Sequence, residues 1–472
     1  MLAARARSST PVTMPTLNRR SFLAASAAAV ASPALAAPTS QVDIAIVGAG
    51  AAGIAAARRI TAARRRVVLI EASDRVGGRC STDARRFGVP YDRGAHWLHS
   101  PDFNPVAKLG RTSGLDISPV PPGQKMRIGR RYAREGEMEE FLTTLVRSNR
   151  AIGEAARLKT DMACAQALPK ELLDWRPTIE FVLGPYGCGK DLTEVSAMDF
   201  ARSSERDTDA FCRQGLGALL AKLAEGLPVQ LASPVTRIDT AVRGGVEIAT
   251  PRGRILADGV IVTASTGVLA AGKIKFDPDL PKRQLDAFNN LKLGSQDRIV
   301  LELPGNPLGL LRDDLVFEKA TGARTAALLA NVAGSPLVTI DVGGKFGREL
   351  AAGGEAAMVG FGLDWLDNLF GSDVKKAVKR TAATQWNDDP WVLGAASAAS
   401  PGGQLARRIL MEPLRERLWF AGEAAHETLW GTVGGAWESG ERAADAAMKT
   451  LRLVVEPKPP AREPARSSRR RR

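Results

Sequence analysis

Side chains that bind metals or carry out redox chemistry are scarce in this chain. Its 472 residues include four cysteines, three histidines and three tyrosines. The cysteines show neither a Cys-x-x-Cys pair nor the mixed Cys/His spacing of a zinc site; they are Cys80, Cys164, Cys188 and Cys212. We therefore expect no metal centre. A disulfide is compatible with an oxidising compartment, but the spacing assigns no pair.

A long apolar run is also missing. The apolar stretch from Ala24 to Val30 is too short to cross a bilayer, so we expect no stable membrane span. The net charge of +14 gathers at the two ends, with +4 in residues 1–37 and +5 in residues 455–472. The charge left for the rest of the chain is modest, so no nucleic-acid partner is expected. Residues 455–472 are predicted to form a basic, solvated and disordered tail.

The first 37 residues have the features of an export signal. Arg19 and Arg20 stand in the string Asn-Arg-Arg-Ser-Phe-Leu, which resembles the twin-arginine pattern. A mildly apolar run follows, and Ala34-Leu35-Ala36 offers a cleavage site with small residues. We therefore predict that residues 1–37 engage the twin-arginine export machinery, which carries folded proteins, and that the mature protein is periplasmic or secreted.

A dinucleotide-binding turn follows the predicted signal. The apolar strand Val42–Val47 runs into a glycine-rich turn that contains Gly48, Gly50, Ala52 and Gly53. The first glycine permits the tight turn, the second lets the backbone approach a pyrophosphate, and the third lets the next helix pack against the strand. That helix is expected over residues 51–63, with its N-terminus as the anion site. Glu71, at the tip of the strand 67–70, is placed to accept hydrogen bonds from ribose hydroxyls.

Two further motifs distinguish the cofactor. Arg75-Val76-Gly77-Gly78-Arg79 follows Glu71, and near the other end Leu418–Glu423 precedes a glycine-rich string over residues 431–440. In this order they resemble the flavin amine oxidase family, which implies bound FAD. The resemblance places Arg79 against the phosphates and Glu423 near the diphosphate and ribitol. It also implies cofactor contacts at Gly422, Thr432, Val433 and Val235, the last through its backbone at the adenine. The helix expected over residues 434–451 would direct its positive end at the flavin.

The segment Tyr91–His99 resembles the family's Gly-Ala-x-Trp-Ile-His string, which passes beneath the flavin ring and is typical of the polyamine oxidase branch. Gly94, Ala95, His96 and Trp97 are the cofactor contacts that it implies. His99 is the candidate for orienting the substrate. All three histidines of the chain lie in these cofactor motifs, the third being His426 in a string that resembles Phe-Ala-Gly-Glu-Ala-Thr-His of the same branch.

The sequence departs from the family at three places. Arg298 stands where family members usually carry a lysine that reaches flavin N5 through water, which leaves the use of oxygen open. Ala395 and Ala396 replace the cysteine and the cage tyrosine of the monoamine oxidase branch, so FAD is expected to be noncovalent and Trp430 is the candidate aromatic wall. Trp97 replaces the arginine that holds a carboxylate in the amino-acid oxidases.

The fold class expected is α/β, with a Rossmann-type FAD-binding domain interleaved with an α+β substrate domain. The first would comprise residues 41–110, 209–277 and 397–454, and the second residues 111–208 and 278–396. The reaction implied is oxidation of an amine by hydride transfer to FAD, with oxygen or another electron acceptor closing the cycle. A flavin dehydrogenase or desaturase, an L-amino-acid oxidase of the same superfamily and a non-catalytic flavin-binding protein stay open as alternatives.

Overall fold

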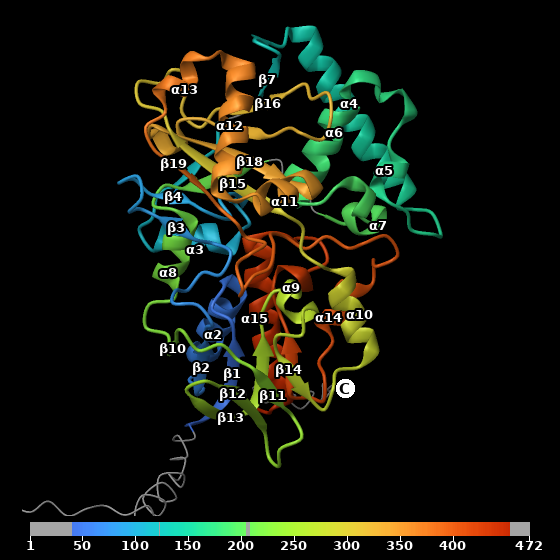
Figure 1. Ribbon diagram of the computed structural model, residues 1–472. Helices are drawn as coiled ribbons and strands as arrows, with labels where there is room; N and C mark the ends of the chain where they lie inside the picture. The colour runs from blue at the N-terminus through green and yellow to red at the C-terminus, as the bar shows by residue number, and fades with distance from the viewer. Residues whose placement is uncertain (1–39, 122, 204–207, 454–472) are drawn as a thin grey trace, which may run out of the picture.

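The structure is a computed structural model that describes residues 40–121, 123–203 and 208–453. Two sheets, each covered by helices, form a lower and an upper part of the molecule (Figure 1). The predicted export signal and the basic tail lie outside the described residues.

The lower sheet has the strand order β10-β2-β1-β13-β12-β11-β14, and β20 pairs with the C-terminal half of β13. Its central strands are parallel, while β12 runs antiparallel to β13 and β11. The bounds are β1 Ser40–Val47, β2 Val67–Ile70, β10 Val229–Gln230, β11 Arg237–Asp239, β12 Val246–Thr250, β13 Gly253–Val262, β14 Lys275–Asp277 and β20 Leu418–Phe420. A parallel sheet of this kind confirms the expected Rossmann-type arrangement.

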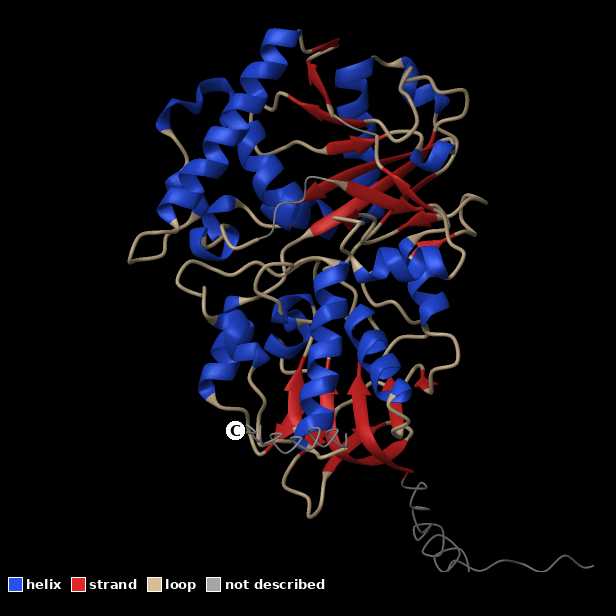
Figure 2. Cartoon of the chain, turned by 180° about the vertical axis from the view of Figure 1, so that it is seen from behind, coloured by secondary structure: helices blue, strands red, loops and turns tan. Residues whose placement is uncertain are grey.

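Alternate residues of β1 face opposite sides of the sheet, as the period of two requires. Ile44 and Ile46 pack against the helices of one face, and Ala45 and Val47 against those of the other. The first face is covered by α2 Ala51–Ala62, α3 Pro105–Thr112, α8 Leu216–Leu223 and α15 Val433–Thr450. The second is covered by α9 Thr266–Ala270, α10 Lys282–Asn290 and α14 Ala406–Met411. The core therefore has one layer of helices on each face of the sheet (Figure 2).

Helices α2 and α15 cross closely, because small residues line the crossing. A Cβ atom built at Gly440 would lie 2.1 Å from the carbonyl oxygen of Ala52. The alanine-rich sequence of α2 and the glycine of α15 thus bring the first and the last helix of this part together, which places the two glycine-rich motifs side by side.

The upper sheet has the order β19-β15-β18-β17-β16-β7-β8 and is largely antiparallel, with β16 and β7 as its parallel pair. Its strands are β7 Lys125–Ile128, β8 Arg131–Tyr132, β15 Gln296–Glu302, β16 Leu315–Glu318, β17 Ala327–Leu329, β18 Leu337–Gly343 and β19 Thr381–Ala383. Helices α11 Gly344–Ala352, α12 Gly354–Phe370 and α13 Asp373–Ala377 pack on one core of this part. A second core contains α4 Glu135–Ala155, α5 Cys164–Ala167, α6 Arg176–Phe181, α7 Ala197–Phe200 and the π-helical turn η2 Val182–Tyr186.

Two small sheets are formed by segments that lie, in the sequence, between strands of the lower sheet and strands of the upper sheet. One pairs β3 Thr82–Asp83 with β4 Tyr91–Asp92, and the other has the order β5-β9-β6, formed by Leu98–His99, Asp209–Cys212 and Ile117–Pro119. The second of them joins the predicted flavin segment to the strand that begins at Asp209.

Helix α4 begins at Glu135, because the side chain of Glu137 accepts a hydrogen bond from the backbone N–H of Arg134 at 2.8 Å and caps the helix there. One element differs from the sequence-based expectations. Helix α10 falls in the segment expected for the substrate domain, yet its buried Phe288 packs in the core of the lower sheet. Its apolar face matches the surface left open by α9 and α14.

The four cysteines are buried, and none of them forms a disulfide. Across the described ranges, no cluster of three potential metal ligands occurs, and no helix is both long enough and apolar enough to cross a bilayer.

Candidate active site

A cavity of about 1770 Å³ extends from the glycine-rich turn of the lower sheet to the strands β15 and β16 of the upper one. Of the candidate residues, all but Gly53 line it: Gly48, Gly50, Ala52, Glu71, Arg79, Gly94, Ala95, His96, Trp97, His99, Val235, Arg298, Gly422, Glu423, Trp430, Thr432 and Val433. The volume exceeds that of a pocket for one small ligand, as expected for a site that holds a dinucleotide and a substrate together.

Each glycine of the turn has a different physical role. Gly48 adopts φ +102°, and a Cβ there would lie 2.6 Å from the hydroxyl of Thr263. A Cβ at Gly53 would lie 1.9 Å from the carbonyl oxygen of Gly48, so Gly53 serves helix packing and does not face the cavity. A Cβ at Gly50 would meet nothing within 4 Å. Gly50 therefore forms an open cradle at the N-terminus of α2, which fits a pyrophosphate.

Glu71 stabilises the same turn from the neighbouring strand. Its buried carboxylate accepts hydrogen bonds from the backbone N–H of Ala49 at 2.6 Å and from the N–H and hydroxyl of Ser73 at 2.9 and 2.8 Å. Glu71 thus fixes the turn to the end of β2, beside the place where a ribose would follow the pyrophosphate. Val235 lines the cavity at the adjoining Pro234–Thr236 segment.

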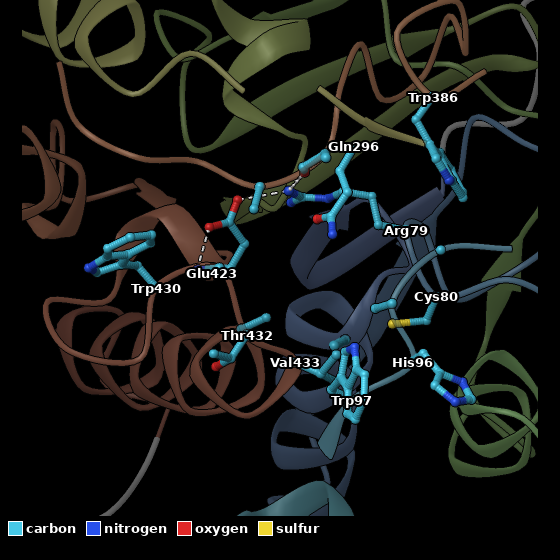
Figure 3. A pocket seen from close by; sticks show the side chains of 18 of the residues that line it. Arg79, Cys80, His96, Trp97, Gln296, Trp386, Glu423, Trp430, Thr432 and Val433 are labelled. Carbon is cyan, nitrogen blue, oxygen red and sulfur yellow. Dashed lines mark hydrogen bonds and ion pairs between the residues drawn. The ribbon is translucent and has the colours of Figure 1, made fainter. Parts of the chain in front are cut away.

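Glu423 is the centre of a buried hydrogen-bond network (Figure 3). Its carboxylate accepts hydrogen bonds from Arg79 Nη1 at 2.8 Å, from the hydroxyl of Ser397 at 2.7 Å and from the N–H of Gly431 at 2.9 Å. Burial by itself would raise the pKa of Glu423, but the guanidinium groups of Arg79 and Arg407 outweigh it, so the pKa is lowered. The carboxylate is therefore ionised, and it holds Arg79 against the cavity.

Arg407 connects this network to the helices of the upper part. It forms a fully buried bidentate pair with Asp199, at 2.7 and 2.8 Å, and also donates to Ser397 and to the carbonyl of Ala424. Its guanidinium lies 4.6 Å from the ring centroid of Trp430. Trp430 is thus held as part of the cavity wall by a cation–π contact.

Helix α15 begins at the cavity. Thr432 is its N-cap and accepts a hydrogen bond from the N–H of Gly435 at 2.9 Å. A Cβ at Gly435 would lie 2.1 Å from the carbonyl oxygen of Leu429, so glycine is required for the loop to approach the helix. The N-terminal end of an 18-residue helix, lined by Thr432 and Val433, therefore directs partial positive charge into the cavity.

The segment Gly94–His99 forms the opposite wall. A Cβ at Gly94 would lie 2.0 Å from the carbonyl oxygen of Arg79, and the N–H of Ala95 donates to that same oxygen. His96 is buried, with Nδ1 2.9 Å from Asp92, and its ring lies 4.2 Å from that of Phe211. Gly94 therefore allows the backbones of two predicted cofactor motifs, one at Arg79 and one at Ala95, to lie in direct contact.

His99 lies further along this wall, on β5, and pairs with a carboxylate. Its Nδ1 is 2.6 Å from Asp209 on the neighbouring strand β9. This partner fixes the ring and leaves Nε2 as the second nitrogen of a side chain that lines the cavity. His426 is placed differently: it is outside the cavity lining, and its Nδ1 accepts hydrogen bonds from the N–H groups of Thr428 and Leu429. It shapes the loop before α15.

Arg298 enters the cavity wall from β15 with its donors already engaged. It forms a bidentate pair with Asp341, at 2.7 and 3.0 Å, and Nη1 donates to the carbonyl oxygens of Asp92 and Gly94 at 2.7 and 3.2 Å. Arg298 therefore connects the upper sheet to the Gly94–His99 wall. An arginine is needed for this role, because a lysine ammonium lacks the planar fork.

The two positions of the wall where the monoamine oxidase branch carries its flavin-linking cysteine and its cage tyrosine hold no nucleophile. Ala395 and Ala396 line the cavity at the positions compared with cysteine and tyrosine. Cys80 also lines it, but burial, followed by the charge of Asp92, raises the pKa of its thiol to about 12. The thiol therefore stays protonated and inert at neutral pH.

The three-dimensional structure adds residues that no motif indicated. Tyr186 on η2, Gln296 on β15, Asp341 on β18 and Trp386 line the same cavity (Figure 3 shows Gln296 and Trp386). The indole N–H of Trp386 donates to the carbonyl of Arg93 at 3.0 Å. A weak signal existed only for Tyr186, as one of three tyrosines in the chain. The others come from strands and loops that carry no motif.

We expect Gly50→Val to abolish binding of the dinucleotide without unfolding the chain. Gly50 has φ −76° and ψ −175°, which valine adopts, and its Cβ would enter open space, but the side chain would occupy the pyrophosphate cradle. The measurement is flavin absorbance per polypeptide, with thermal unfolding as the test of folding.

The control is Gly136→Val, at a helical glycine whose Cβ also meets nothing within 4 Å and which lies outside the cavity lining. It should retain flavin. Normal flavin content in the Gly50→Val protein would show that the cofactor lies elsewhere.

We expect Glu423→Gln to destabilise the protein by about 3 kcal/mol at pH 7, because it leaves Arg407 and Arg79 with an incomplete set of counter-charges. Since the pKa of Glu423 is lowered in the folded state, its contribution to stability is complete above the ordinary value of 4.5 and is lost as the pH falls through the folded value. The difference between the two proteins should therefore shrink below pH 4.5, as measured by denaturant unfolding.

Glu427→Gln serves as the control, because Glu427 forms a partly exposed pair with Arg408. It should cost less than about 1 kcal/mol. A difference for Glu423→Gln that stays constant down to pH 3 would disprove the electrostatic role.

Known proteins share both the sequence and this architecture. Residues 51–448 match the family described as "Flavin containing amine oxidoreductase". Polyamine oxidase 4 of Oryza sativa subsp. japonica is 28% identical over 451 residues, which cover 87% of this chain and 89% of the relative. Cyclohexylamine oxidase from Brevibacterium oxydans IH-35A has the same fold, with a TM-score of 0.73, 22% identity and coverage of 87% of this chain and 99% of that one.

A structure of wild-type putrescine oxidase bound to putrescine also has this fold, with a TM-score of 0.73 at 21% identity; it covers 87% of this chain and 100% of that one. The family match spans most of the chain, from the dinucleotide-binding turn to the last helix. The open cradle at Gly50, the positive end of α15 and the alanines at positions 395 and 396 fit FAD that is held without a covalent bond. The chain belongs to the flavin-containing amine oxidoreductase family and is an FAD-dependent oxidoreductase.

Proposed function

We propose that this enzyme oxidises primary or secondary amines and that it does not oxidise amino acids. The observation that carries this proposal is the state of Arg298, whose guanidinium already donates to Asp341 and to two backbone carbonyls. Trp97 stands at the other position from which an arginine could hold a substrate carboxylate. An amine without a carboxylate requires no such cation, and the relatives' names, polyamine, putrescine and cyclohexylamine oxidase, agree with this choice.

Bound FAD would supply the redox chemistry: a two-electron acceptor at N5 for the hydride of the carbon that carries the amine, which would leave an imine that hydrolyses, and a source of those electrons for oxygen, giving hydrogen peroxide, or for another acceptor. The protein supplies position and electrostatics. The N-terminus of α15, capped by Thr432, favours negative charge at the adjacent part of the cavity. Trp430, held by Arg407, and Trp97 form apolar walls that orient the substrate and exclude water.

Two side chains are placed to contact the amine itself. The ring of His99 is fixed by Asp209 and lines the cavity. Tyr186 also lines the cavity, and burial, with the charge of Asp341, raises the pKa of its hydroxyl. Tyr186 therefore keeps its proton and can donate a hydrogen bond to the lone pair of a neutral amine. The amine must arrive unprotonated, so the rate of cofactor reduction should rise with pH as the free substrate deprotonates.

The structure supports a second candidate function, that of an amine dehydrogenase using an acceptor other than oxygen. Its specific support is again Arg298, at the position compared with the family lysine. Because its donors bind protein oxygens, Arg298 has little capacity to organise a water molecule at the cofactor.

We expect Arg298→Lys to increase the rate at which oxygen reoxidises the reduced enzyme and to change the reductive half-reaction less. A lysine head cannot make all of the bonds of Arg298, so it is free to hold water. Stopped-flow absorbance measures the two half-reactions separately: anaerobic mixing with amine, then mixing of the reduced enzyme with oxygen.

Arg324→Lys is the control, because Arg324 lies outside the cavity lining, beside Phe346. If oxygen reoxidises the Arg298→Lys protein at the wild-type rate, Arg298 has no role in reoxidation. If no amine, amino acid or other donor reduces the flavin, the non-catalytic alternative replaces the proposal.

We propose, from the sequence of residues 1–37, that the enzyme is exported already loaded with FAD. Arg19→Lys combined with Arg20→Lys should retain the precursor in the cytoplasm, because the twin-arginine machinery reads both side chains. Fractionation with an immunoblot measures this outcome, and the conservative change Arg5→Lys is the control. Normal export of the double variant would refute the twin-arginine route.

A further inference from the structure

The part of the cavity that leads away from the flavin walls is apolar, and we call its lining from α4, η2 and β16 the apolar arm. Helix α4 contributes the apolar side chains of Met138, Leu142, Val146 and Ile152, which recur along one side of the helix, and also Asn149 and Gly153. Leu142 and Val146 are large apolar side chains that are 45% and 67% exposed. Their place at the rim of a cavity gives this exposed apolar surface a function.

The inner portion of the arm is apolar as well. Val182 and Leu183 of η2 face Leu315 and Phe317 of β16 across the lining. The ring of Phe317 packs edge-on against Tyr186, with 5.1 Å between the ring centroids. Tyr186 marks the end of the arm, because its backbone carbonyl accepts a hydrogen bond at 3.3 Å from Gln296 of β15, the strand that carries Arg298.

Within the described part of the arm, an ammonium group would find no carboxylate, and the polar side chains there are Asn149 and Tyr186. Among the described residues of the lining, the side chains from α4, η2 and β16 carry no carboxylate. Two acidic residues of the lining near Tyr186 already have partners: Asp341 forms a bidentate pair with Arg298, and Asp209 contacts the ring of His99 at 2.6 Å. An ammonium group moved from water into such an arm loses hydration without compensation.

We infer that the substrate is a monoamine with an extended apolar substituent, and that amines with a second ammonium group are poor substrates. This inference rests on the proposed amine oxidation. The amine nitrogen lies near His99 and Tyr186, and the apolar substituent fills the arm between α4 and β16. Each buried methylene group should improve binding about fourfold until the arm is full.

The test compares two amines of equal length in anaerobic stopped-flow reduction of the intact holoenzyme: heptylamine and the diaminoheptane with an amino group at each end. We expect heptylamine to reduce the flavin with an efficiency, measured as the limiting rate over the dissociation constant, at least tenfold above that of the diamine. Propylamine, which cannot fill the arm, should also be inferior to heptylamine. An equal or better diamine would overturn the inference.

Leu142→Glu should narrow or reverse this preference, because it places a carboxylate in the arm at an exposed helical position. Thr143→Glu is the matched control: it adds the same charge on the neighbouring exposed residue of α4, outside the lining, and should leave the ratio unchanged. Equal ratios in both variants and the wild type would also overturn the inference. If none of the amines reduces the flavin, the proposed amine oxidation itself fails, which is a separate outcome from diamine preference.

Discussion

The site depends on the hydrogen bonds and the ion pair that the buried carboxylate of Glu423 forms. It accepts hydrogen bonds from Arg79, from Ser397 and from the N–H of Gly431, so three segments that are remote in the chain meet at one group. An ionised carboxylate without these partners would be costly inside the protein. Arg407 and Asp199 extend the network and balance its charge. The same set of charges thus positions the loop of Arg79, the start of α15 and the wall at Trp430.

A second buried ion pair, between Arg298 and Asp341, connects the opposite wall of the cavity to the upper sheet. Arg298 and Asp341 belong to the upper sheet, and Arg298 extends two hydrogen bonds to the carbonyls of the segment beneath the flavin position. The pair therefore fixes the position of strands β15 and β18 relative to the wall formed by Gly94–His99. Because protein oxygens already accept from its guanidinium, Arg298 has little capacity left to hold a substrate carboxylate or a water molecule.

Close backbone contacts complete the arrangement. Glycines at residues 53, 94, 435 and 440 lie where any Cβ would come within about 2 Å of a carbonyl oxygen. They let the helices and loops of the cofactor motifs approach more closely than side chains permit. The open cradle at Gly50 is the opposite case, in which space is kept for a ligand. Rigid packing around an open cradle is the preorganisation that binding of a large cofactor requires.

The sequence alone determined the α/β fold class, the family, the cofactor and the strands and helices that carry the motifs, including β1, α2 and α15. These features follow from local rules: apolar runs, glycine spacing and an acidic residue at a strand end. The tertiary structure alone decided the partners. Three features depend on contacts between segments far apart in the chain: Glu423 binds Ser397 and Arg79, Asp341 accepts hydrogen bonds from the guanidinium of Arg298, and Tyr186 and α4 line the apolar arm. The pairing of sheets and the burial of charges select those contacts, and no local spacing encodes them.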